Sequence, residues 1–273
     1  MVPFFAYTTV FLLIPTLVVV IGAFLGTGNQ PTLSNVEGLL QPSVVRGMRQ
    51  SLILSAFTAA GGAAFGGLLA YAVSTTRQGS VTKRFVTSLC GVLAQFGGVA
   101  LAFAFLASFG ATGLLTVWLN AIGVDLGSGL WLYEWNKGLM LVYLYFQLPL
   151  MLIVFLPAVE GLRPQWREAS ETLGGTTWTY WRRIAFPILF PSFVGATLLL
   201  FTNAFSAYAT AAALVSQGSP LLPLQIAGTM RSEVILGQEN LGKAMALAMV
   251  VVVAIVMTMY AWLDKRSSRW MQR

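Results

Sequence analysis

The chain has 273 residues and a mass of 29.4 kDa, and 9% of its residues are charged, whereas a soluble protein carries roughly 25%. Its hydrophobic fraction is 57% and its mean hydropathy is +0.76. These values exceed what the surface of a globular protein can hide. The composition argues against a soluble enzyme and predicts an integral membrane protein.

The residue inventory also limits the chemistry. Cys90 is the one cysteine, and the sequence has no histidine. A lone cysteine excludes a disulfide framework, and the missing histidine removes the commonest metal ligand and general base. Metalloenzymes and histidine-dependent triads are therefore disfavoured. The net charge of +7 comes from short basic clusters between apolar runs, so we attribute it to membrane topology and not to nucleic-acid binding.

Six stretches are long and apolar enough to cross a hydrocarbon core, which takes about 20 helical residues. The first lacks a basic leading region and an obvious cleavage site, so we interpret it as a retained span. No internal repeat or clear break divides the chain. The sequence predicts an all-α integral membrane protein, one six-helix transmembrane bundle over residues 1–273. The expected spans are 2–25, 51–73, 85–107, 138–158, 188–208 and 244–263.

The distribution of lysine and arginine predicts the orientation. If both termini are cytoplasmic, the inner segments hold 11 of the 16 basic residues. These are Arg77, Lys83, Arg84, Arg163, Arg167, Arg182, Arg183, Lys265, Arg266, Arg269 and Arg273. The outer segments, among them the stretch around Asn29, hold Arg46, Arg49, Lys137, Arg231 and Lys243. Cytoplasmic loops carry the excess of positive charge, so we expect both termini inside.

Two smaller patterns predict local structure. Apolar residues recur at helical spacing over 114–122, which indicates a short helix at the membrane interface. Glycines four residues apart, Gly22 with Gly26 and Gly62 with Gly66, give small faces on the first two spans. Such faces ordinarily let helices pack closely.

The segment between the fourth and fifth spans predicts a helix, a tight turn and a second helix, over residues 160–186. Pro164 suits a first helical position, and Gly174 is placed to end that helix in the left-handed conformation. Thr176 can then cap a second helix over 177–184, and Pro187 stands at the entry of the fifth span.

Apolar residues on this segment form two predicted faces outside the bilayer. The first consists of Trp166, Ala169 and Leu173, and the second of Trp178, Trp181 and Ala185. Apolar side chains outside the membrane need a groove, either on another protein or on this protein's own helix ends.

This segment resembles the EAA loop of permease subunits of binding-protein-dependent bacterial ATP-binding-cassette (ABC) importers. The family pattern is Glu-Ala-Ala, three residues, Gly, nine residues, Ile and a closely following Pro. The matching positions are Glu168, Ala169, Gly174, Ile184 and Pro187, and Ser170 replaces the second Ala. The Leu173-Gly174-Gly175 sequence resembles the polyamine, iron(III), thiamine, phosphonate and sulfate permeases more than the sugar permeases.

The resemblance implies that the short helix docks into a cytoplasmic ATPase dimer and passes its closure to the spans. The implied coupling residues are Glu168, Ala169, Ser170, Leu173, Gly174, Ile184 and Pro187. Further implied partners are a second permease subunit, identical or different, and an extracytoplasmic substrate-binding protein, with the complex lying in the bacterial inner membrane. The chain would have no catalytic residue, metal or cofactor of its own, because the ATPase binds ATP and Mg. The substrate would be a polyamine, another small organic solute or an oxyanion.

Uncharged polar residues in or near the spans are the candidates for lining a solute pathway. They are Gln95, Gln147, Asn203, Ser206 and Tyr208. Hydrogen bonding between helices is the alternative for each of them.

Two other functions are weighed against the importer. An ion-coupled secondary transporter predicts buried carboxylates and internal repeats, and we find no Asp or Glu deep in an expected span. A membrane-embedded enzyme needs His, Asp or Glu clustered at membrane depth, which this residue inventory disfavours.

Overall fold

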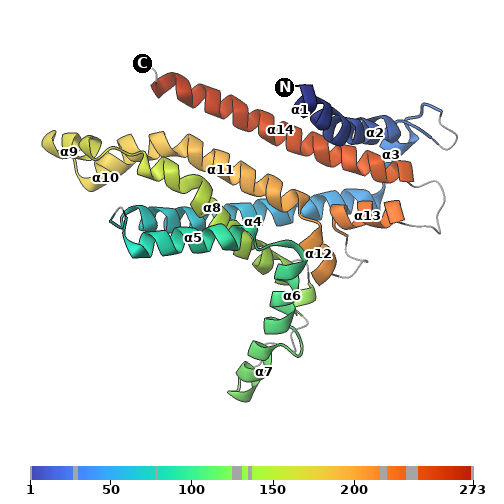
Figure 1. Cartoon of the computed structure of the whole chain (residues 1–273), viewed down its shortest axis with the longest axis horizontal. Helices are drawn as coiled ribbons and strands as arrows, with labels where there is room; N and C mark the ends of the chain where they lie inside the picture. The colour runs from blue at the N-terminus through green and yellow to red at the C-terminus, as the bar shows by residue number, and fades with distance from the viewer. Residues whose placement is uncertain are drawn as a thin grey trace. The chain divides into compact units, whose positions relative to one another are not determined.

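The computed structural model describes residues 2–26, 30–77, 79–124, 131–134, 137–215, 220–231 and 239–271. The described residues are mainly α-helical (Figure 1), and they include two π-helical turns, Thr9–Leu13 between α1 and α2 and Trp181–Ala185 between α10 and α11. The α-helices are α1 (Val2–Thr8), α2 (Ile14–Ala23), α3 (Ser34–Gly38), α4 (Pro42–Ser74), α5 (Val81–Gln95), α6 (Gly98–Phe109), α7 (Leu114–Ala121), α8 (Gly138–Glu160), α9 (Pro164–Thr172), α10 (Thr177–Tyr180), α11 (Phe186–Ser206), α12 (Ala209–Leu214), α13 (Leu222–Arg231) and α14 (Glu239–Met271).

Among the described residues, six helical stretches are long and apolar enough to cross a membrane. Their number confirms the prediction of an all-α, six-span membrane protein. Five of them overlap the expected spans closely, and the third is displaced along the chain. The stretches are Phe4–Ala23, Pro42–Ser74, Gly98–Ala121, Gly138–Glu160, Thr177–Ser206 and Asn240–Trp262.

The expectation of one continuous helix over 85–107 is wrong, because the helix stops in its middle. Helix α5 ends at Gln95, and α6 begins at Gly98. Gly98 has a φ of +67°, a conformation that glycine adopts without the steric penalty of a side chain. The Gly98 carbonyl accepts a hydrogen bond of 3.2 Å from the Thr210 hydroxyl of α12. A partner on another helix therefore satisfies a backbone group at the break.

The short helix expected over 114–122 is present as α7. Helices α6 and α7 are separated by the segment from Gly110 to Gly113, and the third candidate span covers both helices.

The chain divides into two compact units, each described here by itself. The first comprises Met1–Ile53 and Val215–Ile255. Its core is built on Val44, Leu222 and Met245. The Ser51 hydroxyl accepts a hydrogen bond of 2.9 Å from the backbone N–H of Leu222, and this bond attaches the start of α13 to α4.

The second unit comprises Leu54–Leu214 and Val256–Arg273. Helix α8 is its most buried candidate span, and it packs against α5 and α11. The core combines small residues of α4 with larger side chains of α8 and α11, including Met151, Leu152 and Leu200. The unit is therefore organised around α8.

Glycines bring α4 close to α8, as the small-face pattern predicted. A Cβ atom at Gly62 would lie 2.5 Å from the Cβ of Gln147, and one at Gly66 would lie 2.5 Å from the Cβ of Met151. Both distances are shorter than real Cβ contacts allow, so side chains at these positions would push the helices apart. The other predicted pair differs, because Gly22 lies in α2 whereas Gly26 lies beyond its end.

Each π-helical turn precedes a proline. The backbone N–H of Ile14 bonds to the carbonyl of Thr9, just before Pro15. In the same way, the N–H of Phe186 bonds to the carbonyl of Trp181, just before Pro187. A proline lacks the N–H and its ring crowds the carbonyl four residues earlier, so a wider turn relieves both problems. Pro187 thus enters α11 without a break in the helix.

Candidate functional site

The α9–α10 segment contains a well-defined turn at the end of α9. Gly174 has a φ of +78°. Its N–H bonds to the carbonyl of Glu171 at 3.0 Å, and the N–H of Gly175 bonds to the carbonyl of Ser170 at 2.8 Å. These two bonds and the left-handed glycine constitute a Schellman motif, which satisfies carbonyls left free at a helix end. The predicted left-handed stop at Gly174 is therefore present.

The two glycines of this turn are needed for different reasons. A Cβ atom at Gly174 would meet nothing within 4 Å, so its requirement is conformational. A Cβ atom at Gly175 would lie 2.8 Å from the Ser170 carbonyl oxygen and 2.7 Å from its hydroxyl. This second requirement was not predicted from the sequence, although the pair Gly174-Gly175 is visible there.

The second helix begins at a side-chain cap. The Thr176 hydroxyl accepts a hydrogen bond of 3.3 Å from the backbone N–H of Thr179, which satisfies one of the free donors of the first turn. Helix α10 is one turn long and continues through the π-helical turn into α11. The turn is therefore directly connected to the fifth candidate span.

Large apolar side chains on both sides of the turn are exposed. Leu173, just before Gly174, is 88% exposed, and Trp178 on α10 is 72% exposed. Glu168 and Ala169 are also exposed, whereas Ser170 is buried. The one position that departs from the family pattern, Ser170, therefore faces the turn itself and not the surroundings.

The predicted face of Trp178, Trp181 and Ala185 does not exist as one surface. Ala185 is buried, and Trp181 is half-buried with its ring 5.0 Å from that of Tyr71 on α4. The π-helical turn has more residues per turn than an α-helix, so the expected α-helical face is not maintained. Two residues that match the EAA-loop pattern come after Trp181 in the chain. Ile184 is half-buried, and Pro187 is exposed.

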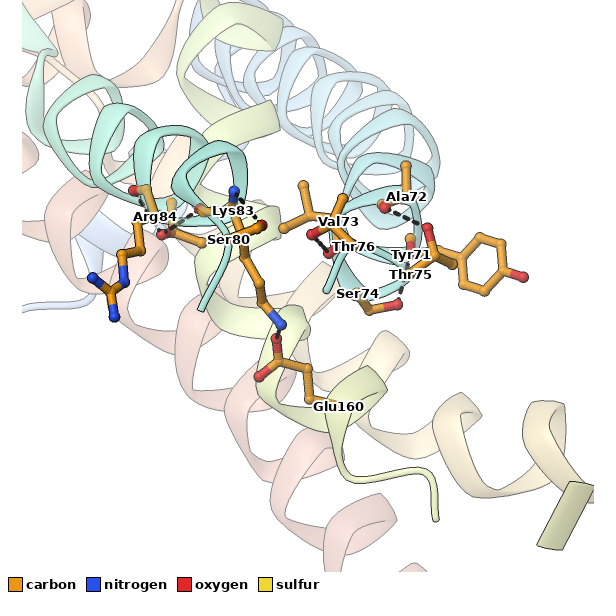
Figure 2. A network of polar contacts seen from close by, with 11 residues as sticks. Tyr71, Ala72, Val73, Ser74, Thr75, Thr76, Ser80, Lys83, Arg84 and Glu160 are labelled. Atoms are coloured by element: carbon orange, nitrogen blue, oxygen red, sulfur yellow. Dashed lines mark hydrogen bonds and ion pairs between the residues drawn. The ribbon is translucent and has the colours of Figure 1, made fainter. Parts of the chain in front are cut away.

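An ion pair fixes the helix ends beside this segment. The Nζ atom of Lys83 lies 2.5 Å from Oε1 of Glu160, and the Ser80 hydroxyl caps α5 by accepting from the Lys83 backbone N–H at 3.2 Å. Figure 2 shows Ser80 and Lys83 at the start of α5 and Glu160 at the end of α8. Glu160 stands four residues before Pro164, where α9 begins.

Within the second unit, the α4–α5 connection and the α9–α10 segment lie at the same end of the helices (Figure 1). This end therefore gathers seven of the basic residues that the orientation argument assigned to the cytoplasm. They are Arg77, Lys83, Arg84, Arg163, Arg167, Arg182 and Arg183.

The candidate pathway residues have different surroundings. Gln147 is completely buried, and its amide donates a hydrogen bond of 2.8 Å to the Leu200 carbonyl of α11. Its Oε1 atom is buried and accepts no hydrogen bond from the residues that the structure describes. Gln95 is exposed at the end of α5, and Asn203 is exposed on α11. Ser206 is also exposed, with its hydroxyl bonded to the Thr202 carbonyl.

Tyr208 is half-buried between α11 and α12. Close to it in the chain, the Ala207 carbonyl accepts a hydrogen bond of 2.7 Å from the Tyr143 hydroxyl of α8. Sequence reasoning had not selected Tyr143, and its aromatic ring among apolar neighbours gave little signal. Gln147 thus connects α8 to the later half of α11, and Tyr143 connects α8 to the residue just after the end of α11.

A family model described as "Binding-protein-dependent transport system inner membrane component" matches residues 3–269. The chain belongs to this family. The match covers the candidate spans and the α9–α10 segment, and it makes the chain a multi-pass component of a membrane transport system.

Two relatives are similar to this chain in sequence, and one solved structure is similar to it in fold. FbpB 1 of Haemophilus influenzae, named for ferric transport, is 25% identical over 269 residues, which is 94% of this chain and 40% of that protein. The sulfate transport system permease CysT of Escherichia coli is 27% identical over 100 residues, 37% of this chain and 34% of that protein. The chain thus spans two fifths or less of these relatives.

The solved structure is a bacterial alginate ABC transporter in complex with an alginate pentasaccharide-bound periplasmic protein. The matched chain has a TM-score of 0.72 and 16% identity, with 97% of this chain and 92% of that chain covered. The likeness shows that the two chains share a fold.

Proposed function

We propose that the chain is the membrane-spanning permease subunit of an ABC importer, and that the α9–α10 segment couples it to an ATPase. The observation that carries this proposal is the exposure of Leu173 and Trp178 on the two sides of a hydrogen-bonded turn. Leu173 lies outside the candidate spans, and Trp178 belongs to the first turn of the fifth. Two large apolar side chains held at fixed positions on either side of a turn fit a cleft on another protein. The direct connection of the turn to α11 gives a rigid route for movement into the bundle.

The proposed assembly places both termini and the α9–α10 segment in the cytoplasm. Its other members are an ATPase dimer, a second permease subunit, identical or different, and an extracytoplasmic binding protein. This chain contributes no catalytic residue and binds no cofactor, because ATP and Mg are held by the ATPase. The collection of seven basic residues at the α9–α10 end of the second unit supports this orientation.

The proposed cargo is a small solute delivered by the binding protein. Ferric ion and sulfate are the first to test, because they appear in the names of the two relatives. A polyamine is the third solute to test, because the Leu173-Gly174-Gly175 sequence resembles a group of permeases that includes those for polyamines. The candidate pathway is formed by the polar positions Gln95, Gln147, Asn203, Ser206 and Tyr208.

The coupling function is tested by two substitutions of one residue. Gly174→Asp places a charge in the turn, at a φ that L residues rarely adopt, and should abolish uptake and weaken ATPase association. Gly174→Asn is the matched control, because asparagine tolerates the left-handed conformation better than most residues. It should retain most of the uptake. Both should reach the membrane at normal levels, because no group lies within 4 Å of the new Cβ.

A third variant tests the contact itself. Leu173→Ser leaves the backbone of the turn intact and removes an exposed apolar side chain, so ATPase co-purification should fall while thermal stability stays unchanged. The measurements are co-purification with the co-encoded ATPase and ATP-dependent uptake into proteoliposomes with the binding protein. Normal ATPase retention and uptake in both Gly174→Asp and Leu173→Ser would refute coupling through this segment.

A further inference from the structure

The first unit contains a groove of about 480 Å³ whose walls come mainly from α4 and α14, with contributions from the end of α3 and the start of α13. All of its lining residues are apolar except Arg49 of α4. The apolar wall includes Val45, Leu52 and Ile53 on α4, and Met245 and Ala248 on α14. One guanidinium group therefore belongs to the wall of an otherwise apolar groove.

The position of Arg49 along α4 places it at the edge of the hydrocarbon region. Helix α4 continues from Gln50 to Ser74 without a charged residue. At 1.5 Å per residue this stretch is about 38 Å long, whereas the hydrocarbon core of a bilayer is about 30 Å thick. The helix can thus cross the core with Arg49 at the level of the lipid headgroups. Leu52 and Ile53 then lie one turn deeper, where the acyl chains begin.

The groove is open on one side, and its charge is not neutralised within the described part of the chain. Val45 is 48% exposed and Ile53 is 42% exposed, and both belong to a candidate span. Arg49 is also exposed, and it forms no ion pair with the acidic residues that the structure describes, Glu37 of α3 included. An occupant of the groove would therefore meet an apolar surface and an available positive charge.

We propose that the groove binds a phospholipid with an anionic headgroup, with the phosphate at Arg49 and one acyl chain along Leu52, Ile53 and Ala248. A guanidinium group matches a phosphate in charge and in hydrogen-bond geometry. An uncharged transmembrane helix in the groove would cover Arg49 without a counter-ion, and an unpaired charge in such a contact is costly. A phospholipid supplies both the anion and the apolar chain, and it surrounds any membrane protein in excess.

The inference depends on the membrane location of the chain. It depends neither on coupling through the α9–α10 segment nor on which side of the membrane the termini occupy. A failure of the ATPase experiments above would therefore leave it intact.

The test is photolabelling of the full chain, purified with its co-encoded subunits in phosphatidylcholine nanodiscs. The probe is a trace of phosphatidylglycerol that carries a diazirine on its acyl chain. Labelled peptides should contain residues of α4 near Ile53 and of α14 near Ala248, and unlabelled phosphatidylglycerol should reduce the labelling more than added phosphatidylcholine does. Arg49→Gln should lower the apparent affinity for phosphatidylglycerol about five-fold, which corresponds to about 1 kcal/mol for one basic residue near the membrane surface. Arg49→Lys keeps the charge and should retain most of the affinity.

Arg46→Gln provides the matched control. Arg46 is an exposed residue of the same helix, three positions before Arg49, but it does not line the groove. Its substitution should leave the labelling of α4 and α14 nearly unchanged. Equal competition by the two lipids, or equal loss in the Arg46 and Arg49 variants, would overturn the proposed site. A cross-link from Ile53→Cys to another subunit, with no acyl labelling of the groove, would also overturn it and would assign the surface to a subunit interface.

Discussion

Lys83 and Glu160 form an ion pair between the start of α5 and the end of α8, and their side chains are 13% and 32% exposed. The pair is therefore more shielded from water than an ordinary surface pair. Its position fixes the end of α8 four residues before α9 begins. Through this contact, the orientation of the α9–α10 segment depends on a residue from a different helix.

Reversing one charge of this pair should reduce stability. Lys83→Glu places two carboxylates together, and we expect the free energy of unfolding to fall by about 1 to 3 kcal/mol, between the values for exposed and buried pairs. The double variant Lys83→Glu/Glu160→Lys should recover most of the loss. Thermal unfolding in detergent measures both effects. Lys137→Glu is the control, because Lys137 and Glu134 are 62% and 48% exposed. An equal loss in the control would show that the Lys83–Glu160 contact has no special role.

Adding one methyl group at Gly66 should separate α4 from α8. A Cβ there would also lie 2.7 Å from the Leu148 carbonyl oxygen, so Gly66→Ala should cost about 1 to 3 kcal/mol of stability. Gly91→Ala, in the interior of α5, meets nothing within 4 Å and should instead stabilise by about 0.5 to 1 kcal/mol. Melting temperatures of the two variants should move in opposite directions. A shift of the same sign in both would contradict the close packing at Gly66.

Gln147 and Asn203 should respond differently to replacement by leucine. Gln147→Leu removes a buried hydrogen bond to α11, and the stability should fall by about 0.6 kcal/mol, the average for interhelical bonds in membranes. Asn203 is exposed on α11, so Asn203→Leu should leave stability unchanged and reduce uptake. Gln95→Leu should also reduce uptake and leave stability unchanged. Normal uptake in both of these variants would remove them from the proposed pathway.

The orientation can be checked with single cysteines in a Cys90→Ser background. Thr82 is an exposed residue of α5, and Thr82→Cys should react only with membrane-permeant reagents if this end is cytoplasmic. Ser80 is less suitable, because its hydroxyl caps α5. Leu40 is 78% exposed in the first unit, and Leu40→Cys should react from the outside. Labelling of Thr82→Cys by an impermeant reagent in intact cells would reverse the topology. Asn29, the other outer position considered, lies outside the described residues.

Local sequence signals predicted the α9–α10 turn accurately. Contacts between segments distant in the chain could not be predicted from such signals. A Schellman turn depends on a glycine with positive φ and on hydrogen bonds within six residues, so the sequence around Gly174 contains the necessary information. The Lys83–Glu160 pair depends on the packing of α5 against α8. Nothing in the local pattern around either residue identifies the other.

The third span shows a different limit. Hydropathy over 85–107 is continuous, and the window average concealed the two adjacent glycines, Gly97 and Gly98, at which the helix breaks. The inward position of Trp181 was missed for a related reason. An α-helical period was assumed for a turn that is π-helical, and residues after such a turn project in other directions.

The π-helical turn before Pro187 also affects how this chain should be aligned with its relatives. Such a turn holds one more residue than an α-helical turn, and it absorbs that residue without rotating the helix that follows. A relative without a proline at this position has no need of the wider turn. We therefore expect the sequence of such a relative to be one residue shorter between the positions of Trp181 and Ala185, with the same face of α11 directed toward α8. An alignment without a gap at this turn would place every later residue of α11 out of register.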